Sequence, residues 1–453
     1  MRKLRMKKWL NWSWALLYAA VLTVTVTLVA RGNHNAIEED TTEKITLTFR
    51  HFWITEHDRP MLNIFEDIVR QYESSHPNVK VNFEGMDQTI HREQKLKSEM
   101  VTGTPPDMFV LFGGAEIEPY IRSNRLMDLT DFVKSNHLEK EFKDLQLWTF
   151  NNRIYGLPIE GNAEPLYVNT SIFNKLGLAL PETIGQLNEA VEVLKKNGYT
   201  PFALGNEDRW PAAVFAHYLM DRYSNPQTID DIVQGKSGAA FQNSGYLKAF
   251  QQLEEWGREG AFGPSPNDLS TEEAIDLFTH GKAAMYLNGN WDITLFHNEK
   301  APSDFQNEVG VIPFPALYPG GERAIAGGYT FGIGLSSNLT EAQKKAAFEL
   351  MQVFYSKDVQ KQIVYEGLRI PSMRIHFDAE KTGPIFTQVT GLMEQNPQTF
   401  VPYDNILSPE VKRSFLAVVE EMINRQITAK DALDRMDDAL KQYWNLRRSS
   451  TVK

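Results

Sequence analysis

The chain of 453 residues carries a formal net charge of −11 and contains no cysteine. This length exceeds one ordinary hydrophobic core and predicts two or three lobes, and a content of 42% hydrophobic and 23% charged residues is typical of a folded, soluble body. The lack of cysteine excludes disulfides, thiol nucleophiles, thiolate metal sites and lipid attachment through a cysteine. The acidic balance, without a basic stripe, argues against binding to nucleic acid or to anionic lipid.

The amino terminus combines a basic start with an apolar run. Five bases in residues 1–8 precede residues 9–30, which carry no charge. This pattern predicts a signal peptide or a membrane anchor over residues 1–30, followed by a polar tether over residues 31–40. Residues 28–30 form an imperfect cleavage site, so cleavage and an uncleaved anchor both remain open. The positive-inside rule places the rest of the chain outside the cytoplasm, attached to the cell surface or secreted.

Strand and helix patterns alternate along the first part of the body. Apolar and polar residues alternate over residues 45–49, which predicts a strand, and Trp53 follows its end. The spacing then predicts a helix from Asp58 to His76, a strand over 79–83, a helix over 88–101 and a buried strand over 108–112. This order is typical of an open, doubly wound α/β sheet.

A second set of elements begins near residue 155. The patterns predict strands over 165–169, 201–204 and 309–314, and helices over 181–197, 246–258, 340–355 and 407–425, with a last helix from Thr428. Trp210 lies at the mouth of a further helix. Pro319-Gly320-Gly321 predicts a hairpin turn that leads into a strand over 324–335.

Residues 278–292 combine the end of a predicted helix, a predicted strand and a polar stretch with a tryptophan. Ser270 and Glu273 have the spacing of a capping box, so a helix runs to Phe278, and residues 282–287 then read as a short buried strand. Asn290, Trp291 and Asp292 therefore lie just past the carboxyl end of that strand, where open α/β sheets bind ligands. A tryptophan between an amide and a carboxylate suits a ring with hydroxyls. The other interpretation is that Trp291 is a core aromatic beside a turn.

Motifs for catalysis, metals and cofactors are absent from the sequence. It has no H-E-x-x-H, no G-x-S-x-G and no clustered histidine pair that would suggest a metal, and Asp230 stands where a P-loop ending in Gly235-Lys236-Ser237 needs its first glycine. We therefore expect no catalytic residue, no metal and no cofactor. Aromatic and polar residues at predicted strand ends suit sugar binding, because rings stack on sugars while carboxylates and amides bond hydroxyls: Trp53, Glu160, Trp210, Asn290, Trp291, Asp292 and Tyr329. Arg369, beside Ile370-Pro371, is either a further ligand contact or a solvated hinge residue.

Several short motifs follow one another along the chain in the order found in one protein family. They are the strand before Trp53, Gly103-Thr104-Pro105-Pro106-Asp107, residues 154–158 and 166–169, Phe278 with residues 281–285, Gly289-x-Trp291, residues 310–315 and Gly327-Gly328. In these the chain resembles the extracellular solute-binding proteins of bacterial ABC importers, family 1, the maltose-binding-like branch. The resemblance extends from about residue 45 to residue 444.

The resemblance implies a type II two-lobe α/β fold, each lobe a sheet flanked by helices and joined by a multi-segment hinge. The amino-terminal lobe would comprise residues 41–162 plus 313–368 and the carboxy-terminal lobe residues 163–312 plus 369–446, with crossings near 160–164, 313–315 and 367–372. Trp210 and Trp291 would stack on the ligand from the second lobe, facing Trp53 and Tyr329 from the first. The implied function is non-enzymatic: a monomer binds a sugar or oligosaccharide between its lobes and delivers it to the transmembrane subunits of an ABC permease.

Several alternatives stay open. Gram-positive relatives usually carry a lipid-modified cysteine after the signal. This chain has no cysteine, so its mode of attachment to the cell surface is open. The ligand could be another solute, such as a peptide, a polyamine or a metal chelate. The lobes could also form a sugar-sensing module for a membrane kinase. An extracytoplasmic glycosidase would need a carboxylate pair, for which Glu160 and Asp292 are the candidates.

Overall fold

The computed structural model describes residues 44–297, 300–395 and 398–451. The predicted signal or anchor over residues 1–30 and the tether over residues 31–40 lie outside these ranges. The strands of the described residues form three sheets and one hairpin, β4 (Thr149–Phe150) with β5 (Arg153–Ile154). Within the same ranges, each helix is too short or too polar to span a lipid bilayer.

The first sheet has the strand order β2-β1-β3-β13-β6. Its strands are β1 (Ile45–His51), β2 (Val79–Gly85), β3 (Met108–Phe112), β6 (Leu157–Pro158) and β13 (Phe331–Leu335). β1 and β3 are parallel, and β13 returns from far along the chain to run antiparallel to both β3 and β6. The doubly wound opening predicted from the sequence is therefore confirmed, with one late antiparallel strand added.

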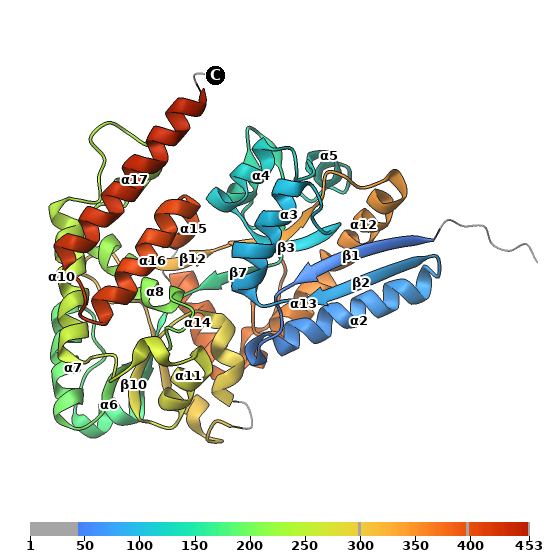
Figure 1. Ribbon diagram of the computed structural model, residues 1–453. Helices are drawn as coiled ribbons and strands as arrows, with labels where there is room; N and C mark the ends of the chain where they lie inside the picture. The colour runs from blue at the N-terminus through green and yellow to red at the C-terminus, as the bar shows by residue number, and fades with distance from the viewer. Residues whose placement is uncertain (1–43, 298–299, 396–397, 452–453) are drawn as a thin grey trace, which may run out of the picture. The chain divides into compact units, whose positions relative to one another are not determined.

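Helices cover both sides of the first sheet. They are α2 (Arg59–Ser75), α3 (Leu96–Thr102), α4 (Glu118–Arg122), α5 (Thr130–Ser135), α12 (Glu341–Phe354) and α13 (Lys357–Tyr365). The apolar face of α2 is buried, and the helix lies on β2 beside α12 and α13 (Figure 1). We call this sheet with these helices the first lobe.

The second sheet has the order β11-β8-β10-β9, formed by β8 (Leu166–Asn169), β9 (Thr200–Ala203), β10 (Ala283–Leu287) and β11 (Val309–Ile312). Its helices are α6 (Thr170–Leu176), α7 (Ile184–Lys196), α8 (Trp210–Tyr223), α9 (Pro226–Val233), α10 (Ser244–Glu259), α11 (Thr271–Thr279), α14 (Pro384–Gln395), α15 (Tyr403–Ile406), α16 (Pro409–Ile423) and α17 (Ala429–Thr451). We call this sheet with these helices the second lobe.

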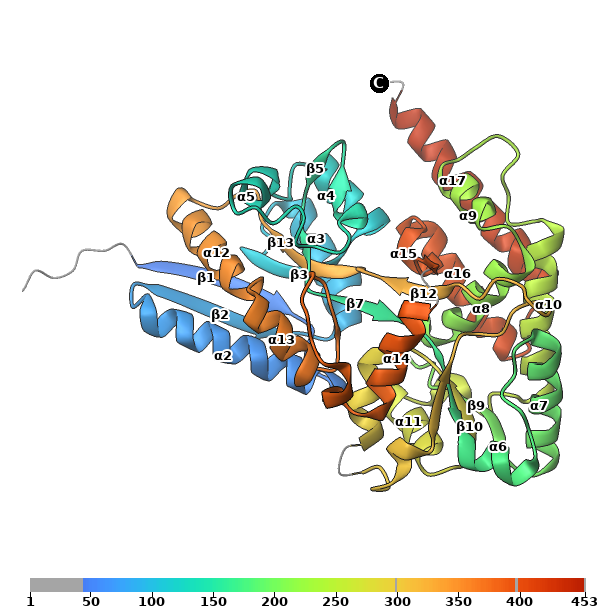
Figure 2. The same cartoon turned by 180° about the vertical axis from the view of Figure 1, so that it is seen from behind.

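Residues of β10 enter two different cores. Met285 and Leu287 pack into the large apolar cluster that includes α8, α10 and α16, whereas Tyr286 points to the opposite cluster with α11 and α14. Figure 2 shows α11 and α14 beside β10, and the contacts of α11 with β10 and of α14 with β11 agree. Both faces of the strand are thus buried, as its continuous apolar sequence predicted.

A third, connecting sheet has the order β14-β7-β12-β15, formed by β7 (Glu160–Ala163), β12 (Ile325–Gly328), β14 (Ile370–Pro371) and β15 (Thr399–Phe400). β7 lies between β6 of the first lobe and β8 of the second, and β12 lies between β11 and β13. The two pair antiparallel, and a Cβ at Gly327 would come within 2.2 Å of the Asn162 carbonyl oxygen, so this position requires glycine. The chain therefore passes between the lobes through paired backbone strands.

The predicted hairpin at Pro319-Gly320-Gly321 is wrong. β11 pairs with β8, whereas β12 pairs with β7 and β15, so β11 and β12 are not partners. The intervening segment is held by a side chain instead, because the buried Arg222 guanidinium donates to carbonyl oxygens at both of its ends, those of Phe314 and Ala324. The strand predicted over 324–335 is divided into β12 and β13.

The capping box of α11 gives the first prediction. The Ser270 hydroxyl accepts from the Glu273 amide, and the Glu273 carboxylate accepts from the Ser270 amide at 2.9 Å. Ser270→Ala leaves a helix-start donor without its partner, and we expect a loss of about 1 kcal/mol in the free energy of urea unfolding. The matched control is Ser74→Ala on the exposed end of α2, where we expect a change within about 0.5 kcal/mol. Equal effects of the two substitutions would contradict the assignment.

Candidate functional site

Trp291 lies at the carboxyl end of β10, as the sequence predicted. The short helix η6 (Asn290–His297) begins directly after the turn at Asn288 and Gly289. The indole ring folds back over Gly289, because a Cβ there would come within 2.2 Å of the ring. Glycine therefore sets the position of the ring, which is half-buried.

Trp210 meets Trp291 edge to face. The ring centroids are 5.9 Å apart and the ring planes are inclined at 60°. One ring comes from the first residue of α8 and the other from η6, and both are half-buried. The structure thus brings two of the predicted residues together as a partly exposed aromatic pair on the second lobe.

Asn290 is fully buried and joins η6 to the connecting sheet. Its Oδ1 accepts from the amide of Ala163 in β7 at 2.9 Å, and its Nδ2 donates to the carbonyl oxygen of Leu368 at 3.5 Å. Both the oxygen and the nitrogen of the side-chain amide therefore form hydrogen bonds to backbone groups. Asn290 therefore orients the segment that carries Trp291.

Arg369 is the centre of a buried ionic network. It is 1% exposed, so the interpretation as a solvated hinge residue is wrong. Its Nε lies 3.3 Å from Glu160 Oε1, and its Nη2 lies 3.3 Å from Asp58 Oδ1 and donates to the carbonyl oxygen of His57 at 3.0 Å. One guanidinium thus connects β7, the segment leading into β14 and the loop after β1.

Asp292 enters the same network from the second lobe. It is fully buried; its Oδ2 accepts from the Tyr286 hydroxyl at 2.7 Å, and its Oδ1 lies 3.8 Å from Nδ1 of His57. His57 belongs to the short helix η1 (Glu56–Asp58), and its Nε2 lies 3.4 Å from Asp58 Oδ2. The imidazole is therefore placed between two carboxylates, one from each lobe.

Burial and charge shift the pKa values of these groups. Burial raises the pKa of Glu160 to about 8 and that of Asp292 to about 6, although nearby cations oppose both shifts. Burial alone would lower the pKa of His57, but Asp58 and Asp292 outweigh it and raise the pKa to about 9. The network therefore places two basic groups, His57 and Arg369, among the acidic side chains Asp58, Asp292 and Glu160, and burial opposes charge on Glu160 and Asp292.

Tyr329 and Trp53 have different surroundings. Tyr329 is half-buried, and its ring lies over Gly161 of β7, where a Cβ would approach it to 2.7 Å. Trp53 is 1% exposed and stacks on Phe65 in the core of the first lobe, with ring centroids 4.4 Å apart. In this structure Trp53 presents no exposed face, whereas Tyr329 adjoins the connecting sheet.

His57, Asp58 and Tyr286 belong to the network but were not among the residues predicted from the sequence. The signal for the first two was present, because they follow the carboxyl end of β1 and parallel strands gather such ends at one edge. We read Asp58 only as a helix start. Tyr286 lies within a continuous apolar run, and nothing in that run marks its hydroxyl as a partner of Asp292.

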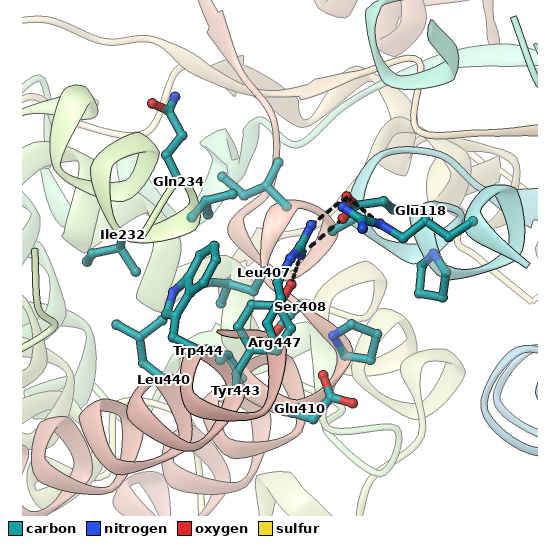
Figure 3. A pocket seen from close by; sticks show the side chains of 17 residues that line it. Glu118, Ile232, Gln234, Leu407, Ser408, Glu410, Leu440, Tyr443, Trp444 and Arg447 are labelled. Carbon is teal, nitrogen blue, oxygen red and sulfur yellow. Dashed lines mark hydrogen bonds and ion pairs between the residues drawn. The ribbon is translucent and has the colours of Figure 1, made fainter. Parts of the chain in front are cut away.

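A separate groove of about 570 Å³ lies between α4 of the first lobe and α9, α16 and α17 of the second (Figure 3). Arg447 spans it, donating to Glu118 Oε1 at 2.8 Å while its guanidinium lies 5.5 Å from the ring centroid of Trp444. None of the predicted site residues lines this groove.

Two further observations describe the acidic side chains of the network. Within the described ranges, no three histidine or acidic side chains are placed to hold a metal ion. Glu160 and Asp292 are 2% and 0% exposed, so neither carboxyl reaches the solvent that a glycosidase pair needs. The arrangement can hold two lobes together and present an aromatic pair.

Comparison with known proteins gives a consistent result. The sequence profile of the bacterial extracellular solute-binding proteins matches residues 59–361. An uncharacterized ABC transporter extracellular-binding protein of Pyrococcus horikoshii is 28% identical over 312 residues, 66% of this chain and 68% of that protein. The multiple sugar-binding protein of Streptococcus mutans is 22% identical over 358 residues, 75% and 80% of the two proteins.

A solved structure of a chitin oligosaccharide binding protein superposes with a TM-score of 0.84. The two sequences are 28% identical, and the match covers 88% of this chain and 98% of the chitin oligosaccharide binding protein. The predicted two-lobe α/β fold of type II is thereby confirmed.

The buried network gives a prediction for pH. Folding raises the pKa of His57 from 6.5 to about 9 and that of Glu160 from 4.5 to about 8, so the folded chain binds more protons than the unfolded chain. His57 stabilises the folded state fully below pH 6.5, and this stabilisation is lost as pH rises to about 9. The raised pKa of Glu160 changes the stability in the same direction between pH 4.5 and 8. The free energy of urea unfolding therefore falls from pH 6.5 to 9.

His57→Gln should make this fall shallower than in the wild type. The exposed pair of His280 with Asp276 supplies the control, since His280→Gln should leave the slope unchanged. Parallel slopes for the wild type and His57→Gln would contradict the assignment.

Gly289 gives a second prediction. Gly289→Ala forces a methyl group into the ring of Trp291, and we expect a loss of about 1–3 kcal/mol in unfolding free energy and a changed near-ultraviolet circular dichroism spectrum. Gly391→Ala in α14 is the control: its Cβ meets nothing within 4 Å, and alanine should stabilise the helix by about 0.5–1 kcal/mol. An unchanged spectrum for Gly289→Ala would show that the ring is not held over Gly289.

Proposed function

The chain belongs to the bacterial extracellular solute-binding protein family, and from this premise we propose that it binds a sugar or oligosaccharide between its lobes and delivers it to an ABC importer. The observation that carries the proposal is the Trp210–Trp291 pair, half-buried at the ligand edge of the second lobe. Flat aromatic faces with polar neighbours suit the alternating C–H and hydroxyl surfaces of a sugar. The names of the Streptococcus mutans relative and of the chitin oligosaccharide binding protein support the same ligand class.

We assign the lobes to residues 41–162 plus 313–368 and 163–312 plus 369–446. Support comes from the connecting sheet, in which β7, β12 and β14 take the chain from one sheet towards the other. Paired strands allow one lobe to rotate against the other while the hydrogen bonds between β7 and β12 persist. Closure around a ligand would then be a hinge motion.

The ligand contacts divide into two groups. Trp210 and Trp291 stack on the sugar from the second lobe, and Tyr329 faces them from beside the connecting sheet. Asn290, Asp292, Glu160 and Arg369 are buried, and we propose that they hold the floor beneath the rings: Asn290 bonds to β7, Glu160 pairs with Arg369 and Asp292 accepts from Tyr286. A direct contact of these four residues with the sugar stays a prediction. A contact from Trp53 stays a prediction and would require its ring to leave the packing on Phe65.

The family is extracellular, in agreement with an extracytoplasmic location, and it is a family of binding proteins rather than enzymes. We propose that the protein acts as a non-catalytic monomer and that its partners are the sugar and the transmembrane subunits of the permease. Residues 1–30 would direct export, as a cleaved signal or as an anchor that replaces the lipid attachment for which the chain has no cysteine.

Isothermal titration tests the proposal. The panel comprises glucose, galactose, maltotriose, raffinose, xylobiose and N,N′-diacetylchitobiose, with spermidine and a tripeptide as other solute classes. We expect binding of at least one sugar and a loss of about tenfold or more in affinity for Trp291→Ala, since a stacked ring contributes about 1 kcal/mol beyond its burial. Tyr318→Ala is the control, because this ring is 62% exposed in the loop after β11 and should not affect affinity.

Failure of every sugar, or an unchanged affinity in Trp291→Ala, would contradict the proposal. Binding of spermidine or the tripeptide alone would assign another solute class. Hydrolysis of a bound oligosaccharide, followed by chromatography of the products, would instead identify an enzyme.

A further inference from the structure

Two short helices join the lobes close to Trp291. η1 follows strand β1 of the first lobe, and η6 follows strand β10 of the second. The Thr294 hydroxyl donates to the carbonyl oxygen of His57 at 3.3 Å, and His57 Nδ1 lies 3.8 Å from Asp292 Oδ1. At the exposed rim, Lys300 Nζ lies 2.5 Å from Glu56 Oε2. The backbone contact, the buried charge contact and the rim contact all cross between the same two segments.

Charged groups face His57 from every element packed against it. Its own helix supplies Glu56 and Asp58, and η6 supplies Asp292. The segment before β14 supplies Arg369 and β7 supplies Glu160, while Asp208, just before α8, also interacts with the imidazole. Arg369 and Glu160 pair with each other, so His57 is the cation that the first lobe places between Asp58 and Asp292.

Asp292 makes the contact dependent on that cation. The carboxylate is fully buried, and its Oδ1 accepts no hydrogen bond from the described residues, while Oδ2 is taken by Tyr286. A buried carboxylate oxygen facing a neutral imidazole lacks the charge that offsets its desolvation. Loss of the proton from His57 would therefore weaken the contact between η1 and η6.

We propose that His57 is a positioning residue for ligand capture: its imidazolium clamps η1 of the first lobe onto Asp292 of the second lobe, so that closure over the sugar takes up a proton. The clamp rests on the proposed function, because the closed form is the one that encloses a sugar. Asp292 directly follows Trp291, so the clamp and the stacking ring lie on one segment. Opening separates η1 from η6, whereas Glu160 and Arg369 belong to the connecting sheet and stay paired.

The direction of the pH effect follows from the surroundings of His57. In this structure its pKa is about 9, raised first by Asp58 of its own helix and then by Asp292 across the contact. Opening removes Asp292 and keeps Asp58, so the part of the raised pKa that Asp292 contributes is lost; closure then favours the protonated ring, and sugar affinity falls as pH rises towards about 9. The steepest possible slope is about tenfold per pH unit.

Titration of sugar binding against pH tests the clamp. The probe is N,N′-diacetylchitobiose, or the panel sugar that binds most tightly, titrated at pH 6.5, 7.5, 8.5 and 9. We expect wild-type affinity to weaken across this range by up to about tenfold, and both His57→Gln and Asp292→Asn to flatten the profile. His280→Gln should retain the wild-type profile, because that histidine pairs with Asp276 of its own helix. A flat wild-type profile, or a His57→Gln profile parallel to it, would overturn the clamp.

The absence of cysteine allows closure to be followed without a sugar. Val101→Cys on α3 and Leu180→Cys on the second lobe lie at positions that are 82% and 40% exposed, and spin labels there report the distance between lobes. We expect the distance to lengthen from pH 6.5 to 9.5 in the wild-type background and not in His57→Gln. If the distance depends on pH but no sugar binds, the clamp is supported and the proposed function is overturned. If the distance is constant but a sugar binds, the proposed function is supported and the clamp is overturned.

Discussion

The buried guanidinium of Arg369 is the interaction on which the arrangement around the candidate site depends. It pairs with Glu160 of β7 and with Asp58 of η1, and it donates to the carbonyl oxygen of His57. Asp58 is the charged partner of the guanidinium, and removing one partner of such a pair costs up to about 3–5 kcal/mol, because the remaining charge loses its compensation. The connecting sheet and the loop after β1 are therefore held in register by a single side chain, and Asp292 joins them through His57.

The position of the aromatic pair, Trp210 and Trp291, depends on these contacts. Asn290 bonds to β7, Asp292 is held by Tyr286, and Trp291 between them rests on Gly289 and meets Trp210. The ring that would contact a ligand is thus attached to the same short helix that contacts the first lobe. Closure of the lobes and orientation of the Trp291 ring are consequently coupled through a few residues of η6. A binding protein of an importer needs this coupling between ligand contact and lobe closure.

The sequence was informative where the pattern was local. The capping box of α11, the buried strand β10 and the position of Trp291 after it are short-range features, and the structure confirms them. The hairpin at residues 319–321 failed because Arg222, distant in the sequence, holds that segment. Glu160 and Arg369 were named from the sequence, but their contacts with each other and with His57 were not predicted, since these residues are far apart in the chain. The burial of Trp53 depends on packing against Phe65.

A crystal structure with a bound sugar would show directly whether the aromatic pair is the ligand site. We expect a sugar ring stacked within about 4 Å of Trp291, enclosed by both lobes, with His57 against Asp292. A sugar bound elsewhere, such as the groove between α4 and α17 that Arg447 spans, with Trp210 and Trp291 free of ligand, would contradict it.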